Sequence, residues 1–262
     1  MKSAIQCAIR SSHLRFLDRG LPPRLAVYMH SLEREQYGPF RVFVEYMRSQ
    51  DYDFVDLETF FACNGRKVIY LSFDDNYRAW FDALQLFSLL GVKATFYVNT
   101  NVIRDRTCAS DIEAYYDRID HHQERIPLSS EELKTLSSSG HAIGSHTHSH
   151  FLLTSLRTCE ARSEISRGKQ ELEDILGQPV DHFSYPFGMR RHFSEELRHY
   201  CRDIGFKTIA NAISAMQHSP QTPLHIQRSL WRLDQSLEHN LGNLRVDGAL
   251  FAEITGRSAL GE

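Results

Sequence analysis

The sequence predicts an α/β fold, a parallel (β/α) barrel or barrel-like sheet of about seven strands. Short apolar runs alternate with segments of helical periodicity along the chain, which is the pattern of repeated strand–helix units. The length of 262 residues is enough for one large domain with a substantial core. Polar residues directly follow several of the apolar runs, and catalytic groups in parallel barrels lie at the carboxyl ends of the strands.

The expected strands are short apolar runs with clear limits. The first follows the Pro22-Pro23 break, the second stops at Asp74-Asp75, and the fifth is ended by Pro186 and Gly188. In chain order, strands are expected over 24–30, 68–73, 93–98, 142–145, 180–184, 206–210 and 226–230.

The expected helices carry capping signals at their ends. Asp56 precedes one helix as an N-cap, Ser129 begins another with acidic residues in its first turn, and Gly91 and Gly177 stand where C-caps belong. Helices are expected over 40–50, 56–63, 78–90, 129–140, 158–176 and 193–204, with one more at the C-terminus.

The segment 99–127 has mixed charge and weak periodicity, which indicates a long excursion from the barrel. Long excursions in compact domains are usually functional or mobile loops. There is no internal repeat, low-complexity segment or linker. We therefore expect one domain over 24–262, preceded by an N-terminal extension over 1–23.

The charge balance argues against nucleic acid as a main partner. Lys and Arg number 30 and Asp and Glu 33, so the net charge of −3 leaves no basic surplus to neutralise phosphates. No apolar run reaches the length of a transmembrane segment. The five cysteines are scattered, and the apolar start of the chain is interrupted at Gln6 and Arg10, short of a signal peptide. These features predict a cytoplasmic protein.

The run His146-Thr147-His148-Ser149-His150 places three of the 14 histidines within five residues. Histidines at i and i+4 share one face of a turn, so His146 and His150 can reach a single zinc-sized ion. Two histidines and one carboxylate would leave coordination positions open for water, as in a catalytic site. The alternative is a solvated polar turn.

Asp74 and Asp75 come directly after an apolar strand. Adjacent side chains leaving a strand diverge, so one carboxylate could bind a metal while the other faces a water molecule. The alternative is a helix N-cap followed by an acidic residue, which is a common pairing.

Three motifs occur in order: Ser72-Phe73-Asp74-Asp75-Asn76, the histidine run, and Ser184-Tyr185-Pro186-Phe187-Gly188. Together they resemble Thr-Phe-Asp-Asp-Gly, His-Ser/Thr-x-x-His and Arg-x-Pro-Tyr/Phe-Gly of the NodB-type polysaccharide deacetylases, carbohydrate esterase family 4. Members of this family remove acetyl groups from N-acetylated sugars. The resemblance covers about residues 24–232 and implies the distorted barrel of that family.

The resemblance implies a role for each matched residue. Asp75, His146 and His150 would hold a divalent metal, zinc first of all, although this donor set also accepts cobalt, nickel or iron. Asp74 would be the general base for the attacking water. The backbone N–H near Tyr185 would help to stabilise the tetrahedral oxyanion.

The chain departs from the family pattern in two places. Asn76 replaces a glycine, a mild change because asparagine accepts left-handed backbone geometry. Ser184 replaces the arginine that supports the base in the family. Arg228 on the last strand could supply that cation instead, or it could be a surface ion-pair residue. His148 lies inside its motif but at no ligand position of the family.

The general acid has two candidates. Many family members carry it in a Leu-x-His motif near the C-terminus, and Pro223-Leu224-His225 does not match that spacing. A subset resembling the exopolysaccharide deacetylases places a histidine after an early strand, which Tyr28-Met29-His30 approximates. We predict His30 rather than His225, because the end of the first strand should face the same rim as the metal ligands.

These expectations combine into a metal-dependent hydrolase that removes acetyl groups from an N-acetylated saccharide. One alternative is a catalytically silent carbohydrate-binding relative, which the change at Ser184 permits. Another is an amidohydrolase-type zinc site built on His146-Thr147-His148, although that family places its His-x-His after the first barrel strand. The identity of the sugar and the oligomeric state do not follow from the sequence.

Overall fold

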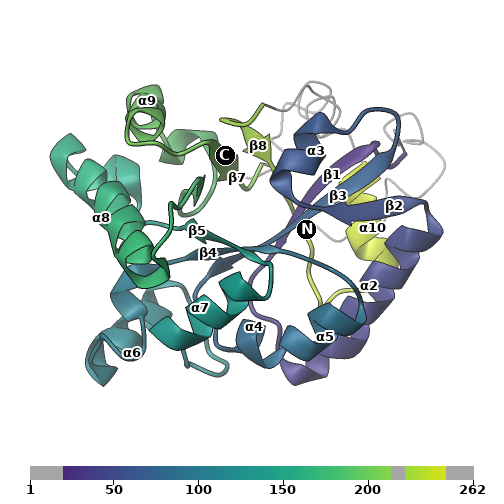
Figure 1. Ribbon diagram of the computed structural model, residues 1–262, viewed down its shortest axis with the longest axis horizontal. Coiled ribbons are helices and arrows are strands. Elements are labelled where there is room, and N and C mark those ends of the chain that lie inside the picture. The colour runs from purple at the N-terminus through teal and green to yellow at the C-terminus, as the bar shows by residue number, and fades with distance from the viewer. Residues whose placement is uncertain (1–19, 214–221, 246–262) are drawn as a thin grey trace, which may run out of the picture.

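A curved parallel sheet forms the centre of the protein, and helices cover its outer side (Figure 1). The computed structural model describes residues 20–213 and 222–245, so the expected extension over 1–23 lies mostly outside the described residues. The strands are β1 (Arg24–Met29), β2 (Tyr52–Val55), β3 (Lys67–Asp75), β4 (Thr95–Val98), β5 (Ala142–Ser145), β6 (His182–Ser184), β7 (Thr208–Asn211), β8 (Ile226–Gln227) and β9 (Ser229–Leu230). Their order is β8-β7-β6-β5-β4-β3-β1-β9, with β2 beside β3.

The last two strands close the sheet into a barrel. β8 pairs with β7, β9 pairs with β1, and a single residue, Arg228, separates the two short strands. The segment that the sequence predicted as one strand therefore joins both edges of the sheet. All strand pairs are parallel, which confirms the predicted fold class.

The strand count differs from the expected seven for two reasons. The closing segment is split at Arg228, and β2 was not predicted. β2 has only four residues, and it includes the exposed Asp53 and follows Asp51, which has a positive φ of 65°. Judged by sequence alone, this acidic stretch is typical of a turn. In the structure, β2 pairs with the first half of β3.

The helices lie close to their predicted positions. They are α2 (Tyr37–Ser49), α3 (Leu57–Ala62), α4 (Ala79–Asp82), α5 (Leu84–Leu89), α6 (Ala109–Arg118), α7 (Ser130–Ser138), α8 (Thr158–Leu176), α9 (Glu195–Asp203) and α10 (Leu237–Arg245). The Ser129 hydroxyl caps α7 by accepting from the N–H of Glu132, and Gly177 ends α8 with a φ of 67°. The segment expected as one helix over 78–90 is divided at Ala83.

The long excursion over 99–127 contains a helix that was not predicted. α6 buries Tyr115 and Tyr116 in consecutive positions, so its apolar residues do not show a clear helical period. The Tyr116 hydroxyl donates to the carbonyl of Asn76, just beyond β3, over 2.8 Å. The excursion is thus packed against the end of the barrel that carries Asp74 and Asp75.

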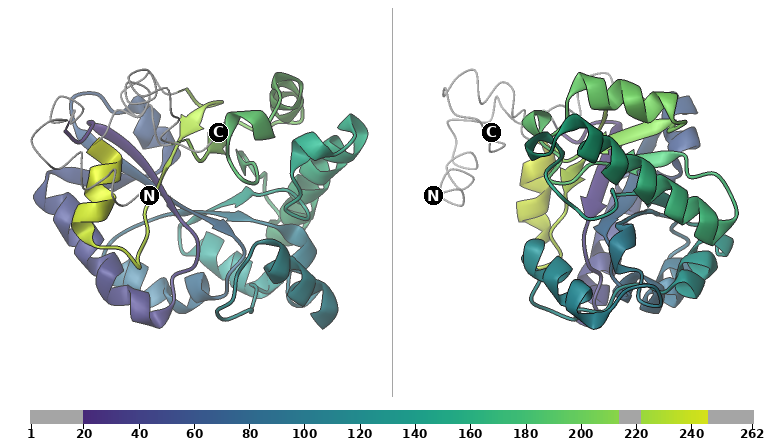
Figure 2. Two further views of the ribbon diagram at one scale, coloured as in Figure 1. Left: turned by 180° about the vertical axis from the view of Figure 1, so that it is seen from behind. Right: turned by 90° about the vertical axis from the view of Figure 1, so that its left-hand side faces the viewer.

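Side chains alternate between the two faces of the sheet, as the period of two requires. A small buried cluster combines residues of five strands with two residues of α3, and these strand residues therefore meet inside the barrel: Ala26, Leu57, Phe60, Val68, Tyr70, Tyr97, Ala210 and Ile226. Ser72 and Asp74 continue the inward face of β3 towards its carboxyl end. A larger apolar cluster fills the layer between the sheet and the helices. Figure 2 shows the helices around the sheet from two further sides. Among the described helices, none has the length and hydrophobicity needed to cross a membrane.

Candidate active site

Three predicted metal ligands converge at the carboxyl ends of β3 and β5. One ligand atom each from Asp75, His146 and His150 lies within 4.8 Å of the other two. The Oδ1 atom of Asp75 is 3.6 Å from Nε2 of His146 and 3.3 Å from Nε2 of His150. All three residues are buried. Two imidazoles and a carboxylate in this arrangement fit a divalent metal with coordination positions left for water.

The hydrogen bonds of His146 favour the tautomer that a metal ligand needs. Its Nδ1 lies 2.6 Å from the carbonyl oxygen of Ser184, so a proton on Nδ1 is donated there and Nε2 keeps its lone pair towards Asp75. Burial is the main reason that the pKa of His146 is lowered, to about 4, so the ring is neutral near pH 7. Metal binding requires neutral imidazole, so both observations fit the predicted role.

The backbone at the site is strained. Six residues other than glycine have positive φ within the described ranges, and four of them lie here: Asp75 (86°), Thr147 (70°), His150 (58°) and Phe187 (62°). Positive φ is uncommon for residues other than glycine and is most costly here for the β-branched Thr147 and the bulky Phe187, so it persists only where the surroundings hold it. Strain of this kind is concentrated at functional sites, and here it lies in all three motifs of the sequence.

Arg228 forms a bidentate ion pair with Asp74 inside the barrel. Its Nη1 and Nη2 atoms donate to Oδ1 and Oδ2 of Asp74 over 2.6 and 2.7 Å. The remaining donors have acceptors too: the Ser72 hydroxyl at 2.9 Å, the Ser184 hydroxyl at 2.7 Å and the Asn211 carbonyl at 2.9 Å. All five N–H groups of this fully buried guanidinium are therefore satisfied.

The Arg228 charge decides the ionisation of Asp74. Burial alone would raise the pKa of this carboxyl group, but the Arg228 guanidinium and its hydrogen bonds outweigh that effect and hold the pKa below its ordinary value. The rings of Tyr28 and Tyr97 lie 4.8 and 5.1 Å from the guanidinium carbon and add cation–π attraction. Ser184, which stands where the resemblance expects an arginine, accepts a hydrogen bond from Arg228.

The two candidate general acids lie in different places. His30 follows β1, is exposed, and lines the same cleft of about 600 Å³ as Asp74 and Asp75. Its backbone carbonyl accepts a hydrogen bond from the Trp80 indole over 2.8 Å, which fixes the chain at this point. His225 is exposed before β8 and does not line the cleft.

The third motif contributes backbone and aromatic surface to the cleft. Tyr185 and Phe187 both line it, with Pro186 between them. The Tyr185 ring is buried and stacks on Phe193 at 4.5 Å, whereas the Phe187 ring is half exposed and meets the His150 ring edge-on at 5.0 Å. Proline has no N–H, so the amides of this turn available to a substrate are those of its neighbours.

Sequence reasoning missed two residues that hold the ligands. The Tyr77 hydroxyl donates to Oδ2 of Asp75 over 3.0 Å, and the Asn99 side chain donates to the backbone carbonyl of His146. Asn99 follows β4 directly, so its position after a predicted strand was a usable signal. Tyr77 carries no comparable signal, because a tyrosine after a strand is more often part of the core.

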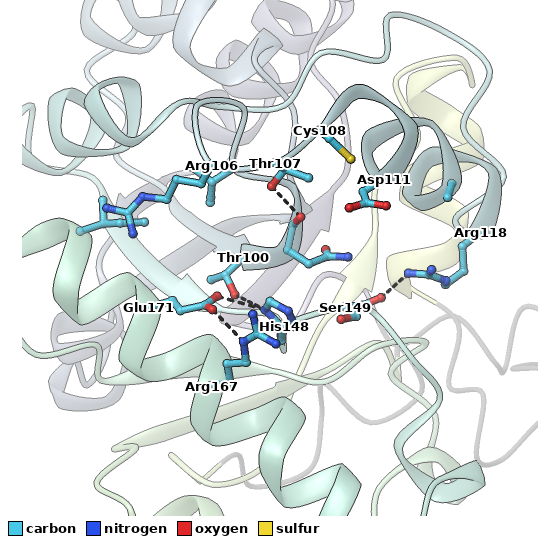
Figure 3. A pocket seen from close by; sticks show the side chains of 14 residues that line it. Thr100, Arg106, Thr107, Cys108, Asp111, Arg118, His148, Ser149, Arg167 and Glu171 are labelled. Atoms are coloured by element: carbon cyan, nitrogen blue, oxygen red, sulfur yellow. Dashed lines mark hydrogen bonds and ion pairs between the residues drawn. The ribbon is translucent and has the colours of Figure 1, made fainter.

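His148 lies on the opposite side of its turn from the metal ligands. Its Nδ1 atom is 2.9 Å from the Thr100 hydroxyl and 3.0 Å from Oε2 of Glu171 (Figure 3). A second cavity, of about 490 Å³, lies on this side of the turn. The structure thus separates His148 from His146 and His150, and the group of possible ligand atoms formed by Asp75, His146 and His150 does not include it.

The comparisons with known proteins agree with this architecture. The sequence profile of the polysaccharide deacetylase family matches residues 62–209, more than half of the chain. IcaB from Ammonifex degensii has a similar fold, with a TM-score of 0.66, 17% identity, and coverage of 87% of this chain and 99% of its own. The deacetylase PplD of Streptococcus pyogenes, solved with acetate, gives a TM-score of 0.65 and 18% identity over 86% of this chain and 98% of its own.

At these identities the solved structures support the fold alone, and no curated protein sequence matches the chain. The profile match carries the assignment, because it includes the first two motifs with their aspartates and histidines and the third motif as well. The chain belongs to the polysaccharide deacetylase family, carbohydrate N-deacetylases that hydrolyse carbon–nitrogen bonds.

Proposed function

We propose that this protein is a metal-dependent hydrolase that removes the acetyl group from an N-acetylated saccharide. The observation that carries the proposal is the placement of two carboxylates with different partners in one cleft. Asp75 faces two histidines, and Asp74 faces Arg228. One carboxylate is thus suited to bind a metal and the other to accept a proton.

Asp75, His146 and His150 would hold the metal, with zinc, cobalt, nickel or iron each compatible with their donor atoms. When bound, such an ion would lower the pKa of a coordinated water molecule and polarise the acetamide carbonyl. The hydroxyl of Tyr77 holds Asp75 in place by binding the carboxylate oxygen that does not face the histidines. This second contact orients the ligand as metal sites generally require.

Asp74 would take the proton of the attacking water. Its pKa is kept below the ordinary value by Arg228, so the carboxylate is ionised and able to accept. Each carboxylate oxygen has two lone pairs, and the bidentate contact with Arg228 uses one on each oxygen. We assign Arg228 as a positioning residue that fixes this carboxylate and keeps it charged.

The remaining roles follow the shape of the cleft. A backbone N–H of the turn at Tyr185 would donate to the oxyanion as negative charge develops on it. His30 would protonate the departing amine, because it lines the same cleft as the two aspartates. An amine is a poor leaving group unless it is protonated as its bond to carbon breaks.

The amidohydrolase-type alternative requires His146 and His148 to bind one ion. The structure weighs against it, because the His148 ring interacts with Thr100 and Glu171 on the far side of the turn. The second alternative, a relative that binds carbohydrate without catalysis, is distinguished by measuring whether acetate is released. The arginine missing from position 184 does not by itself favour it, since Arg228 contacts the same aspartate.

The proposal is tested with zinc-loaded protein and N-acetylglucosamine oligomers, by measuring bound metal and released acetate. We expect His146→Ala to lose both bound metal and acetate release, because two remaining ligands rarely retain a catalytic ion. His148→Ala is the matched control, and its effect on both should be much milder. Unchanged metal content in the His146 variant would refute the site. Metal binding without acetate release from any acetylated sugar would favour the binding relative.

A further inference from the structure

Helix α8 packs directly against the turn that carries two of the proposed metal ligands. The backbone N–H of His148 donates to the carbonyl of Glu164 over 2.9 Å, and the N–H of Ser149 donates to Oε2 of the same residue over 2.7 Å. One glutamate of α8 thus binds two successive amides of the turn. Residues 146–150 and α8 are joined here by the backbone of the turn itself.

Gly168 allows the helix to approach this closely. A Cβ atom at this position would lie 2.7 Å from the carbonyl carbon of Thr147, 2.9 Å from Oγ of Ser145 and 3.0 Å from the N atom of His148. Real Cβ atoms almost never come within 3.0 Å of other heavy atoms, and two of these three are backbone atoms that cannot move aside alone. Glycine in the middle of a helix costs about 0.5–1 kcal/mol relative to alanine. The close approach of the turn explains why a glycine stands here in spite of that cost.

The turn needs support from outside because its own conformation is unfavourable. Thr147 and His150 both have positive φ, which is uncommon for residues other than glycine and especially unfavourable for the β-branched Thr147. Further contacts on this side come from α8 and from other elements. Glu171 of α8 and Thr100 reach His148, and Arg118 donates to the Ser149 carbonyl over 2.6 Å (Figure 3). The N–H of Asn101 donates to the His148 carbonyl over 3.0 Å. These contacts leave the Nε2 atoms of His146 and His150 directed at Asp75.

We propose that α8 is a clamp that positions the metal site, with Glu164 and Gly168 as its positioning residues. Glu164 holds the two amides, and Gly168 lets the turn lie against the helix. Together they keep the strained turn in the one conformation that directs Nε2 of both histidines to Asp75. The inference rests on the proposed metal site and goes beyond it by naming residues outside the three motifs.

The test uses full-length protein reconstituted with Co²⁺, whose absorption spectrum reports ligand geometry and whose affinity is measured by competition with a chelator. The variants are Gly168→Ala and Glu164→Ala. Glu164→Gln is the conservative variant, because its amide oxygen can still accept from Ser149. Gly242→Ala is the matched control, since Gly242 is also helical and has no atom within 4 Å of an added Cβ. Thermal unfolding of the metal-free proteins is recorded in parallel.

We expect Gly168→Ala and Glu164→Ala to weaken Co²⁺ binding at least 10-fold and to change its spectrum, which is the scale of losses at supporting residues of metal sites. Glu164→Gln and Gly242→Ala should bind Co²⁺ as the parent does. If Gly168→Ala does not fold, Glu164→Ala and Glu164→Gln decide. Parent-like affinity and spectrum in Glu164→Ala would overturn the clamp while leaving the metal site intact. Absence of Co²⁺ binding by the parent would overturn the metal site and the clamp with it.

Discussion

Replacing Arg228 by methionine tests whether the ion pair with Asp74 is the central electrostatic element of the barrel. Methionine keeps an unbranched apolar stem, so the change removes the charge, the five N–H donors and the guanidinium group while the packing of the stem remains. Asp74 would then be a buried carboxylate without its cation, and removal of one partner from a buried ion pair costs about 3–5 kcal/mol. We expect the free energy of unfolding to fall by that amount, which is a large part of the stability of an ordinary domain.

A double-mutant cycle separates this effect from a general loss of packing. Asp74→Asn alone leaves the Arg228 charge buried, and Arg228→Met alone leaves the Asp74 charge buried. The double variant leaves neither, so its loss of stability should be smaller than the sum of the single losses by about 1–3 kcal/mol. The measurement is urea-induced unfolding of the metal-free proteins at pH 7. Additive single losses would refute the proposed energetic link between the two side chains.

The pH dependence of stability gives a second test of the ion pair between Asp74 and Arg228. The folded-state pKa of Asp74 is depressed, so this group contributes stability above its unfolded pKa of about 4, and the contribution is lost as the pH falls through the folded pKa. Without Arg228, burial dominates and raises the folded pKa. The variant should therefore gain relative stability on acidification, opposite to the parent. A parallel pH profile in both proteins would contradict this reasoning.

Two further predictions concern the reaction. Asp74→Asn should retain bound metal but lose acetate release, because an amide cannot take the proton of water. Asp75→Asn should weaken metal binding itself. The reverse pattern would exchange the two roles. His30→Ala should lower kcat by about 10²-fold or more with metal content unchanged and should alter the alkaline limb of the pH–rate profile, whereas His225→Ala should have little effect. An inactive His225 variant beside a normal His30 variant would refute the assignment of the acid.

The sequence was most informative where the relevant pattern is local. The spacing of His146 and His150, and the position of Asp75 directly after an apolar run, need only the geometry of one turn and one strand end. Parallel strands present their carboxyl ends on one side of the sheet, so these local patterns combine into one site by sequence reasoning alone. The structure brings these three side chains together as the sequence predicted.

The sequence was less informative where contacts depend on distant segments. Arg228 and Asp74 are 154 residues apart, and their contact depends on how the barrel closes. The sequence offered Arg228 as a possible cation but could not distinguish it from a surface residue. Gly168 within a helix gave no sign of its partner, because the close approach to Thr147 depends on the packing of α8 against the end of the barrel.

Barrel closure and the ionisation of Asp74 have the same structural cause. β8 and β9 belong to opposite edges of the sheet, and the residue between them must lie where those edges meet. Arg228 occupies this point, and its side chain extends inward to the carboxylate on β3 and to Ser184 on β6. An arginine at position 184 would put a second guanidinium beside the first in a fully buried space, where like charges are strongly unfavourable. The small hydroxyl of Ser184 leaves room for Arg228 and accepts one of its hydrogen bonds. The absence of the family arginine at Ser184 and the presence of Arg228 on the closing segment are therefore two parts of one arrangement, in which the cation reaches the base from a different strand.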